Sequence, residues 1–243
     1  MTKLAALLFI MAGISAAHAQ RFSVNVGYAM PQSDFAKTST VLTDYSTISP
    51  NEKGGRFGAA SNGFNVELEV SKELNQNMDF YSGIGLMYNG ISEAIDSVVA
   101  NHYGNGIYLY EGLSMTVPVY FNIPWISGIR YSCPLSNSVS LFADAGFGVN
   151  MRVITKYSLD YTYVGTTGNT TWDYSKRLTF ARRVSVGATL HDHYSVRASY
   201  CKFGKAKVIS SVTQQLGGMS DRFDHESDEM DTRLFTISLG YTF

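Results

Sequence analysis

The chain has 243 residues and a formal net charge of −1, from 19 Lys and Arg against 20 Asp and Glu. Hydrophobic residues make up 45% of it and charged residues 16%, which excludes intrinsic disorder. The near-neutral balance gives no electrostatic footprint for nucleic acid, so no nucleic-acid partner is expected. Because the mean hydropathy is only −0.04, the apolar residues either fill a soluble core or alternate with polar residues along strands.

The N-terminal segment is typical of a secretory signal peptide. Lys3 supplies a positive start, an apolar or small run extends from Leu4 to Ile14, and small residues precede a cut after Ala19. This run is too short for a membrane anchor, which needs ~20 apolar residues. We therefore expect residues 1–19 to be a signal peptide and residues 20–243 to form one exported domain.

Strict alternation of apolar and polar residues recurs along the rest of the chain, and it predicts strands with one apolar face. The last segment is the clearest, with apolar residues at every second position from Phe235 to Phe243 and Thr, Ser or Gly between them. Eight strands are expected, at about residues 22–28, 64–71, 78–89, 110–123, 138–151, 178–190, 194–203 and 235–243. Pro118 would lie inside the fourth strand and remove a ladder hydrogen bond, so a bulge is expected there.

The links between these strands alternate in length. Long links are expected between the first two strands and at residues 90–107, 152–177 and 204–231, an intermediate link at 124–137 and a very short one at 191–193. Long loops at one end and mostly short turns at the other are typical of an outer-membrane barrel.

The alternative is a soluble β-sandwich or a lipocalin-like barrel, in which the apolar face points inward. The polar face carries Gly, Ser, Thr and Asn with few charges, which suits a narrow lumen better than a surface in water. Aromatic residues near the strand ends, among them Phe22, Tyr88 and Trp125, suit interfacial girdles. The prediction is an all-β fold, an eight-stranded antiparallel transmembrane up-and-down β-barrel in the cell outer membrane.

Two segments carry a family resemblance. The signal peptide, the eight alternating segments and the final strand with Leu239, Tyr241 and Phe243 resemble outer-membrane barrels and the C-terminal signal read by the barrel-assembly machinery. Residues 113–121 resemble the strand pattern L-x-x-x-[IV]-P-[VL] of small Bacteroidetes barrels, grouped as PorT-like or outer-membrane β-barrel-domain proteins. This resemblance spans the mature chain, and it implies a part in an envelope machine such as the type IX secretion system.

Strand parity places five charged residues in the lumen, namely Glu67, Glu69, Asp144, Arg183 and Arg197. The interior of an eight-stranded barrel is just wide enough for side chains to fill, so we expect a packed polar core and no diffusion pore. Asp144 and Arg183 fall at mid-height on neighbouring strands, with Glu67 or Glu69 near enough to join them. Because buried charges are tolerated when they are paired, we expect an ion-pair network with a structural role, in preference to an ion pathway.

The remaining polar residues leave alternatives open. Arg182 and Lys202 have lipid-facing parity, so either they reach towards anionic head groups or lipopolysaccharide phosphates, or a local register shift turns them. The acidic residues of 221–231 could hold Ca²⁺ or Mg²⁺, but their spacing matches no calcium-loop motif, so a solvated loop is favoured. Cys133 and Cys201 fall on different strands, so no disulfide is expected.

No catalytic constellation is evident. A hydrolase needs Ser, His and an acid at one membrane interface, and none of the His residues lies on a strand beside an outward Ser. We expect a non-catalytic protein, without metal or cofactor, in a structural or interaction role that presents extracellular loops. Its expected partners are the lipid bilayer, lipopolysaccharide, the barrel-assembly machinery and envelope proteins. The alternatives are a lipid-modifying outer-membrane enzyme and a small-solute channel.

Overall fold

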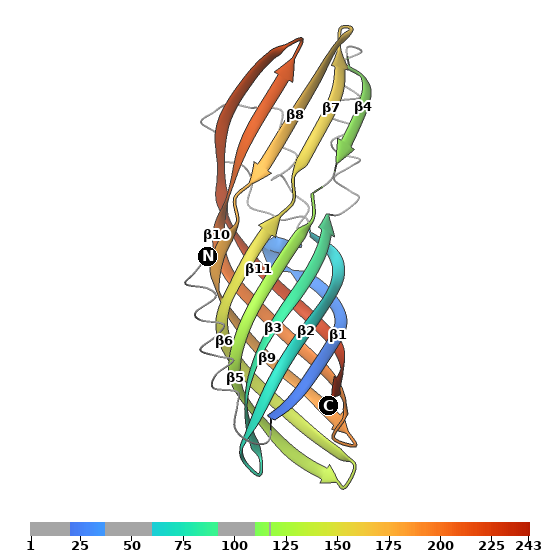
Figure 1. Ribbon diagram of the computed structural model, residues 1–243, viewed down its shortest axis with the longest axis vertical. Helices are drawn as coiled ribbons and strands as arrows, with labels where there is room; N and C mark the ends of the chain where they lie inside the picture. Colours follow the sequence, from blue (N-terminus) through green and yellow to red (C-terminus); the bar gives the residue numbers. More distant parts are fainter. Residues whose placement is uncertain (1–19, 37–59, 92–109, 117) are drawn as a thin grey trace.

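The computed structural model describes residues 20–36, 60–91, 110–116 and 118–243, and the expected signal peptide at 1–19 lies outside this part (Figure 1). Eight strands pair antiparallel with their neighbours, and the last of them pairs with the first, so the sheet closes into a barrel. The predicted eight-stranded barrel is confirmed. Its strands are β1 (Gln20–Gln32), β2 (Ala60–Asn75), β3 (Met78–Ile91), β5 (Tyr120–Ser136), β6 (Val139–Ile154), β9 (Arg177–Leu190), β10 (Tyr194–Leu216) and β11 (Met219–Thr242).

The alternation in the sequence decides which side chains face out of the barrel. Val26 on β1 pairs in register with Leu239 on β11, and the two side chains are 53% and 66% exposed. The residues between the outward positions are buried in the lumen, among them Asn25 and Ser238. The outer wall is therefore apolar, as a surface in contact with lipid requires.

One end of the barrel, the short-turn end, carries the tight turns and both ends of the domain. The turns lie at residues 76–77, 137–138 and 191–193. The amide of Phe243 donates to the carbonyl of Phe22 at 2.9 Å, which fixes the C-terminus beside the start of β1. Within the described ranges, the chain forms no helix of the length and hydropathy needed to cross a bilayer.

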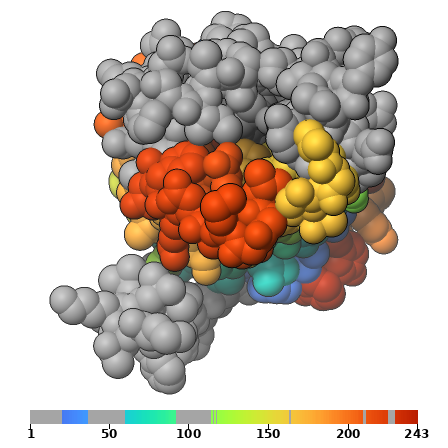
Figure 2. Space-filling model, turned by 90° about the horizontal axis from the view of Figure 1, so that it is seen from above, coloured from blue at the N-terminus to red at the C-terminus, as the bar shows by residue number. Residues whose placement is uncertain are grey.

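The opposite end carries a sheet that continues beyond the barrel. The short strands β8 (Thr166–Tyr174), β7 (Tyr157–Tyr163) and β4 (Tyr110–Thr116) pair in the order β10–β8–β7–β4 beside the long ends of β10 and β11. We call β4, β7, β8 and these ends the projecting sheet; it forms the top of Figure 1, and the tips of β10–β11 and β7–β8 face the viewer in Figure 2. The loops expected at 152–177 and 204–231 are thus largely strand, which corrects the prediction.

The fourth predicted strand, at residues 110–123, is also wrong. Residues 110–116 form β4, which pairs with β7 outside the barrel, and the barrel strand is β5, which covers most of the link expected at 124–137. Pro118 lies between β4 and β5, where it breaks no ladder. Pro124 is inside β5 instead, and the β3–β5 pairing is interrupted there because proline has no amide hydrogen to donate.

Candidate functional site

The structure places the five charged residues predicted for the lumen inside the barrel. Glu67 and Glu69 lie on β2, Asp144 on β6, Arg183 on β9 and Arg197 on β10, and each is at most 8% exposed. Since β2 is not a neighbour of β9 or β10 in the sheet, the contacts between them cross the lumen.

The two arginines on β9 and β10 hold both glutamates. Arg197 lies 3.2 Å from Glu67 Oε2 through Nη1 and 3.0 Å from Glu69 Oε2 through Nη2. Arg183 also pairs with Glu67, lies 3.4 Å from Glu69 Oε2, and reaches Asp144 Oδ1 at 3.7 Å through Nε. Each glutamate is therefore neutralised by two guanidinium groups of these arginines, as buried carboxylates require.

A third arginine, Arg130 on β5, completes the cluster. Its Nη2 lies 2.8 Å from Glu69 Oε1 and 3.1 Å from Asp144 Oδ2. The sequence analysis missed it because residues 124–137 were taken as a link. The alternation of outward Trp125, Ile129 and Tyr131 was the signal that could have placed it. We call Arg130, Arg183, Arg197, Glu67, Glu69 and Asp144 the lumen network; its formal charges sum to zero.

Tyr81 on β3 packs inside the lumen network. Its hydroxyl donates to Asp144 Oδ1 at 3.4 Å, and the guanidinium carbons of Arg130 and Arg183 lie 5.3 and 4.9 Å from the ring centroid. Two glycines make room for the ring. A Cβ added to Gly128 or Gly146 would lie 2.7 or 2.4 Å from the Tyr81 hydroxyl. The tyrosine therefore depends on the small residues that face it.

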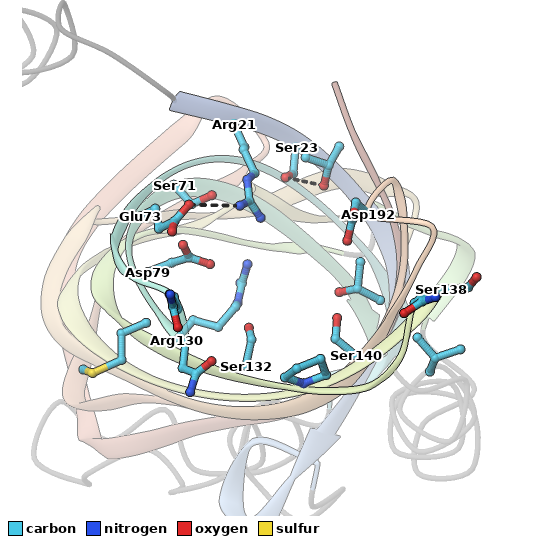
Figure 3. Close-up of a pocket in the computed structure, with 18 of the residues that line it drawn as sticks. Arg21, Ser23, Ser71, Glu73, Asp79, Arg130, Ser132, Ser138, Ser140 and Asp192 are labelled. Atoms are coloured by element: carbon cyan, nitrogen blue, oxygen red, sulfur yellow. Dashed lines mark hydrogen bonds and ion pairs between the residues drawn. The ribbon is translucent and has the colours of Figure 1, made fainter.

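A polar recess of about 520 Å³ leads from the short-turn end to the lumen network (Figure 3). Arg21 and Glu73 pair across its wall at 3.6 Å, and Ser23 shares a hydrogen bond with Thr242 at 2.9 Å. Because Arg130 belongs both to the lining and to the buried lumen network, the recess ends there. Its hydroxyl lining comprises Ser23, Ser71, Ser132, Ser136, Ser138, Ser140, Thr189 and Thr242.

The other half of the lumen holds an apolar layer together with buried polar residues, namely Asn89, Asn122, Asn150, Arg152 and Thr232. Phe35, which follows β1 in the 3₁₀ helix η1 (Ser33–Phe35), packs edge-on against Tyr120 at 5.0 Å between ring centroids. The expectation of a packed polar core therefore holds only in part for this half, because alternation identifies the inward face without requiring it to be polar. The buried layer comprises Ala29, Phe35, Ala60, Met87, Tyr120, Ile154, Ala181, Cys201, Phe203, Val208, Met230 and Leu234.

The other predicted features are placed as follows. Cys133 is exposed and Cys201 is buried, and both are free thiols. The acidic segment 221–231 belongs to β11 and is no loop, and in the part of the chain that is described no three His, Cys, Asp or Glu side chains converge as metal ligands. His191 and His193 lie in the short turn, where His193 Nδ1 is 2.9 Å from the carbonyl of Thr242. His102 lies outside the described residues.

The C-terminal residues of the expected assembly signal face outward on the last strand. Leu239, Tyr241 and Phe243 are 66%, 39% and 70% exposed. The rings of Tyr241 and Phe243 lie 5.0 Å apart, and Phe22 approaches Phe243 at 5.8 Å, which forms an aromatic cluster at the short-turn end. Phe64, Tyr88 and Phe121 form a second cluster nearer the other end. Two aromatic belts that bound an apolar wall are typical of membrane barrels.

Residues 4–243 match the protein family described as the outer membrane protein beta-barrel domain. The chain belongs to this family. The protein is therefore an outer-membrane barrel, and its short-turn end, which carries Gln20 and Phe243, faces the periplasm, since such barrels have short periplasmic turns. The projecting sheet of this family member lies outside the cell.

Solved structures with similar barrels include OprG from Pseudomonas aeruginosa, with 14% identity, a TM-score of 0.47 and coverage of 93% of this chain and 96% of that one. A major outer membrane protein from Thermus thermophilus has 12% identity, a TM-score of 0.47 and coverage of 93% and 100%. Ail of Yersinia pestis has 14% identity, a TM-score of 0.40 and the same coverage. No curated protein is similar enough to match the chain.

Proposed function

We propose that this outer-membrane barrel is a non-catalytic interaction protein whose working surface is the projecting sheet. The observation that carries this proposal is the position of the sheet, which continues β10 and β11 beyond the barrel on the side away from the short turns. Its faces are built from ordered strands and include a packed group of Tyr157, Leu159, Trp172 and Val212. A rigid sheet held by the barrel presents a defined surface to another protein.

The lumen supports the same proposal. The buried lumen network crosses the barrel at mid-height, and the apolar layer and the buried polar residues beside it fill the half above. These two layers leave the polar recess as a blind pocket on the periplasmic side. Each carboxylate of the lumen network lies within ion-pair distance of at least two arginines, so a catalytic acid or base role is not favoured.

In its more specific form, the proposal is that the barrel is a PorT-like subunit of an envelope or secretion machine. The strand pattern at residues 113–121 and the C-terminal signal support this form, which also makes the barrel-assembly machinery a partner during biogenesis. Because β4 and the link to β5 carry that pattern, the motif connects the projecting sheet to the barrel. A partner bound to the sheet would therefore act on the segment that resembles the PorT-like proteins.

The test is to shorten the projecting sheet without touching the barrel. Ser210 and His225 are register partners, so residues 211–224 can be replaced by an Asn-Gly turn that joins them. We expect the shortened protein to keep its heat-modifiable gel mobility and to lose envelope proteins that cross-link to the full protein in native membranes. The matched control replaces the periplasmic turn at 137–138 with Asn-Gly. We expect this control to keep the cross-linked envelope proteins.

Other results would contradict the proposal. An unchanged set of cross-linked partners would show that the sheet is not the working surface. Stepwise single-channel conductance of the full protein in planar bilayers would favour a channel. Deletion of the gene could also change the lipid composition of the outer membrane. If the full protein restored that composition and a variant lacking one polar residue of the barrel wall did not, this would favour a lipid-modifying enzyme.

A further inference from the structure

Three basic side chains form a row on the outer wall of the barrel. Lys202 on β10 pairs in register with Arg182 on β9 and with Arg233 on β11. The neighbours Arg183 and Cys201 point inward and are buried, so Arg182 and Lys202 keep the outward parity. The register shift in β10 comes only after Lys202, between Lys202 and Lys205. The structure thus excludes the register shift that was one of the two alternatives for Arg182 and Lys202.

The row lies in the outer part of the membrane-spanning wall. Lys202 is eight residues along β10 from Tyr194 at the periplasmic end, which is about 27 Å of strand. At a strand tilt of ~35–45° this is roughly 20 Å across the bilayer, close to the full height of a ~25 Å apolar band. The row is therefore about 5 Å below the lipid head groups of the outer leaflet, within reach of long basic side chains, and the outward residues Phe180 and Leu178 of β9 lie further out.

The residues just below the row are apolar. On the same three strands, Val184, Tyr200 and Phe235 form the next outward register row towards the periplasm. Val184 is 56% exposed and Tyr200 is 38% exposed, so this surface is open to acyl chains. A basic row above an apolar row is complementary to a lipid with an anionic head.

One carboxylate shares the row but does not neutralise it. Asp231 accepts a hydrogen bond from Arg233 Nε at 2.9 Å, and its Oδ2 lies 3.7 Å from Lys202 Nζ. Arg182 has no carboxylate partner among the described residues, and its guanidinium lies 5.8 Å from the centroid of the Phe180 ring. Three cations around one carboxylate leave two positive charges at the edge of the apolar band, where an uncompensated charge is costly.

We propose that Arg182, Lys202 and Arg233 bind a phosphate of lipid A, the anchor of lipopolysaccharide in the outer leaflet. Arginine offers a planar pair of donors that matches phosphate oxygens, and Lys202 adds a point charge between the two arginines. The acyl chains lie on Val184, Tyr200 and Phe235. This site depends on the outer-membrane location and is independent of the function proposed for the projecting sheet.

The experiment compares lipid A with and without its phosphates. The full barrel is refolded in detergent, titrated with phosphorylated lipid A or with the same lipid after phosphatase treatment, and the retained lipid is measured by native mass spectrometry. The unaltered protein is expected to retain the phosphorylated lipid. The double variant R182Q/K202Q is expected to bind it about tenfold or more weakly, the size of effect that loss of charge-assisted hydrogen bonds produces.

Two further variants complete the test. Lys72→Gln removes a lone outward cation at the periplasmic end of β2 and is expected to leave binding unchanged. Asp231→Asn removes the competing carboxylate and is expected to tighten binding severalfold. All variants are first shown to keep heat-modifiable mobility, since the altered side chains lie outside the lumen.

Four results would overturn the proposal. The first is equal retention of the phosphorylated and phosphatase-treated lipids. The second is binding by R182Q/K202Q that matches the unaltered protein. The third is displacement of the lipid by millimolar inorganic phosphate, which would show that the row binds a free anion. A protein that cross-links to the row in native membranes in place of lipopolysaccharide would also contradict it.

Discussion

Arg183 and Arg182 are neighbours in the chain and illustrate two opposite ways of placing charge in a membrane protein. Arg183 points into the lumen network, where three arginines face three carboxylates and the charges cancel. Arg182 points to the outer wall, where three cations share the single carboxylate of Asp231. The inner cluster is complete within the chain, whereas the outer row lacks its counter-ion. This comparison shows that charge balance, and not the number of charges, separates a structural cluster from a binding surface.

The largest expected effect comes from breaking the inner cluster. Arg183→Ala leaves Glu67, Glu69 and Asp144 with fewer cations inside the barrel, and we expect it to lower the free energy of unfolding by about 3–5 kcal/mol. Urea unfolding in detergent, followed by heat-modifiable gel mobility, measures this. The matched control is Arg182→Ala, one residue away on the outer face, which we expect to change stability by less than about 1 kcal/mol. Equal effects of the two variants would contradict the comparison.

The two glutamates are expected to differ. Glu69 lies within ion-pair distance of Arg130, Arg183 and Arg197, whereas Glu67 contacts only two of these. We expect Glu69→Gln to cost roughly 3 kcal/mol of unfolding free energy and Glu67→Gln about 1 kcal/mol less, because one more charge-assisted contact is lost. Unfolding of both variants in the same urea series measures the difference. A larger loss of unfolding free energy for Glu67→Gln would show that the number of ion-pair contacts does not decide how much each glutamate stabilises the barrel.

A smaller effect is expected from filling the space that holds Tyr81. A Cβ at Gly146 would lie 2.4 Å from the Tyr81 hydroxyl and 2.8 Å from the Ser127 carbonyl oxygen, so Gly146→Ala should cost about 1–3 kcal/mol. Part of this loss should be recovered in the Tyr81→Phe background, which lacks the hydroxyl. Gly85→Ala, whose nearest contact would be 3.3 Å from Pro124, is the control on the neighbouring wall. Absence of any recovery would assign the loss to the contacts with the Ile126 side chain and the Ser127 carbonyl oxygen.

The last prediction concerns the access of a thiol reagent to the two cysteines and not the stability of the barrel. Cys133 is exposed near the periplasmic end of β5, and Cys201 is 1% exposed among the inward apolar residues. A membrane-permeant maleimide should label Cys133 at the rate of a free thiol and leave Cys201 unlabelled in the folded barrel. Mass spectrometry of the labelled peptides distinguishes the two sites. Labelling of Cys201 in the folded protein would mean that water reaches the apolar half of the lumen.

Strand parity allowed five members of the lumen network to be predicted, because a side chain in a strand points to one face or the other according to its position alone. Arg130 was missed since Pro124 and Pro134 make residues 124–137 look like a link, although both prolines lie within β5. The apolar half of the lumen was missed for a different reason. Alternation identifies the inward face of a strand, but Met87, Phe203 and Leu234 show that this face can be apolar where it packs against itself.

The projecting sheet illustrates the limit of local patterns. Residues 204–231 carry many charges and were expected to form a loop, yet β10 and β11 pair with each other almost to the turn at 217–218. β8, β7 and β4 then extend the same sheet. Their strand structure depends on partners distant in the chain, such as Tyr110 beside Tyr163. Outside the membrane no apolar wall is required, so the clear alternation of the barrel strands is absent there.

The sequence by itself determined the number of barrel strands, the inward and outward faces of all of them except β5, and the end that carries the short turns, because these follow from the two-residue period of a strand and from link length. The tertiary structure alone decided which strands close the barrel, which carboxylate meets which arginine across the lumen, and that Arg182, Lys202 and Arg233 share one row. These contacts depend on the register between strands far apart in the chain. That register is set when the sheet closes on itself, and no local pattern encodes it.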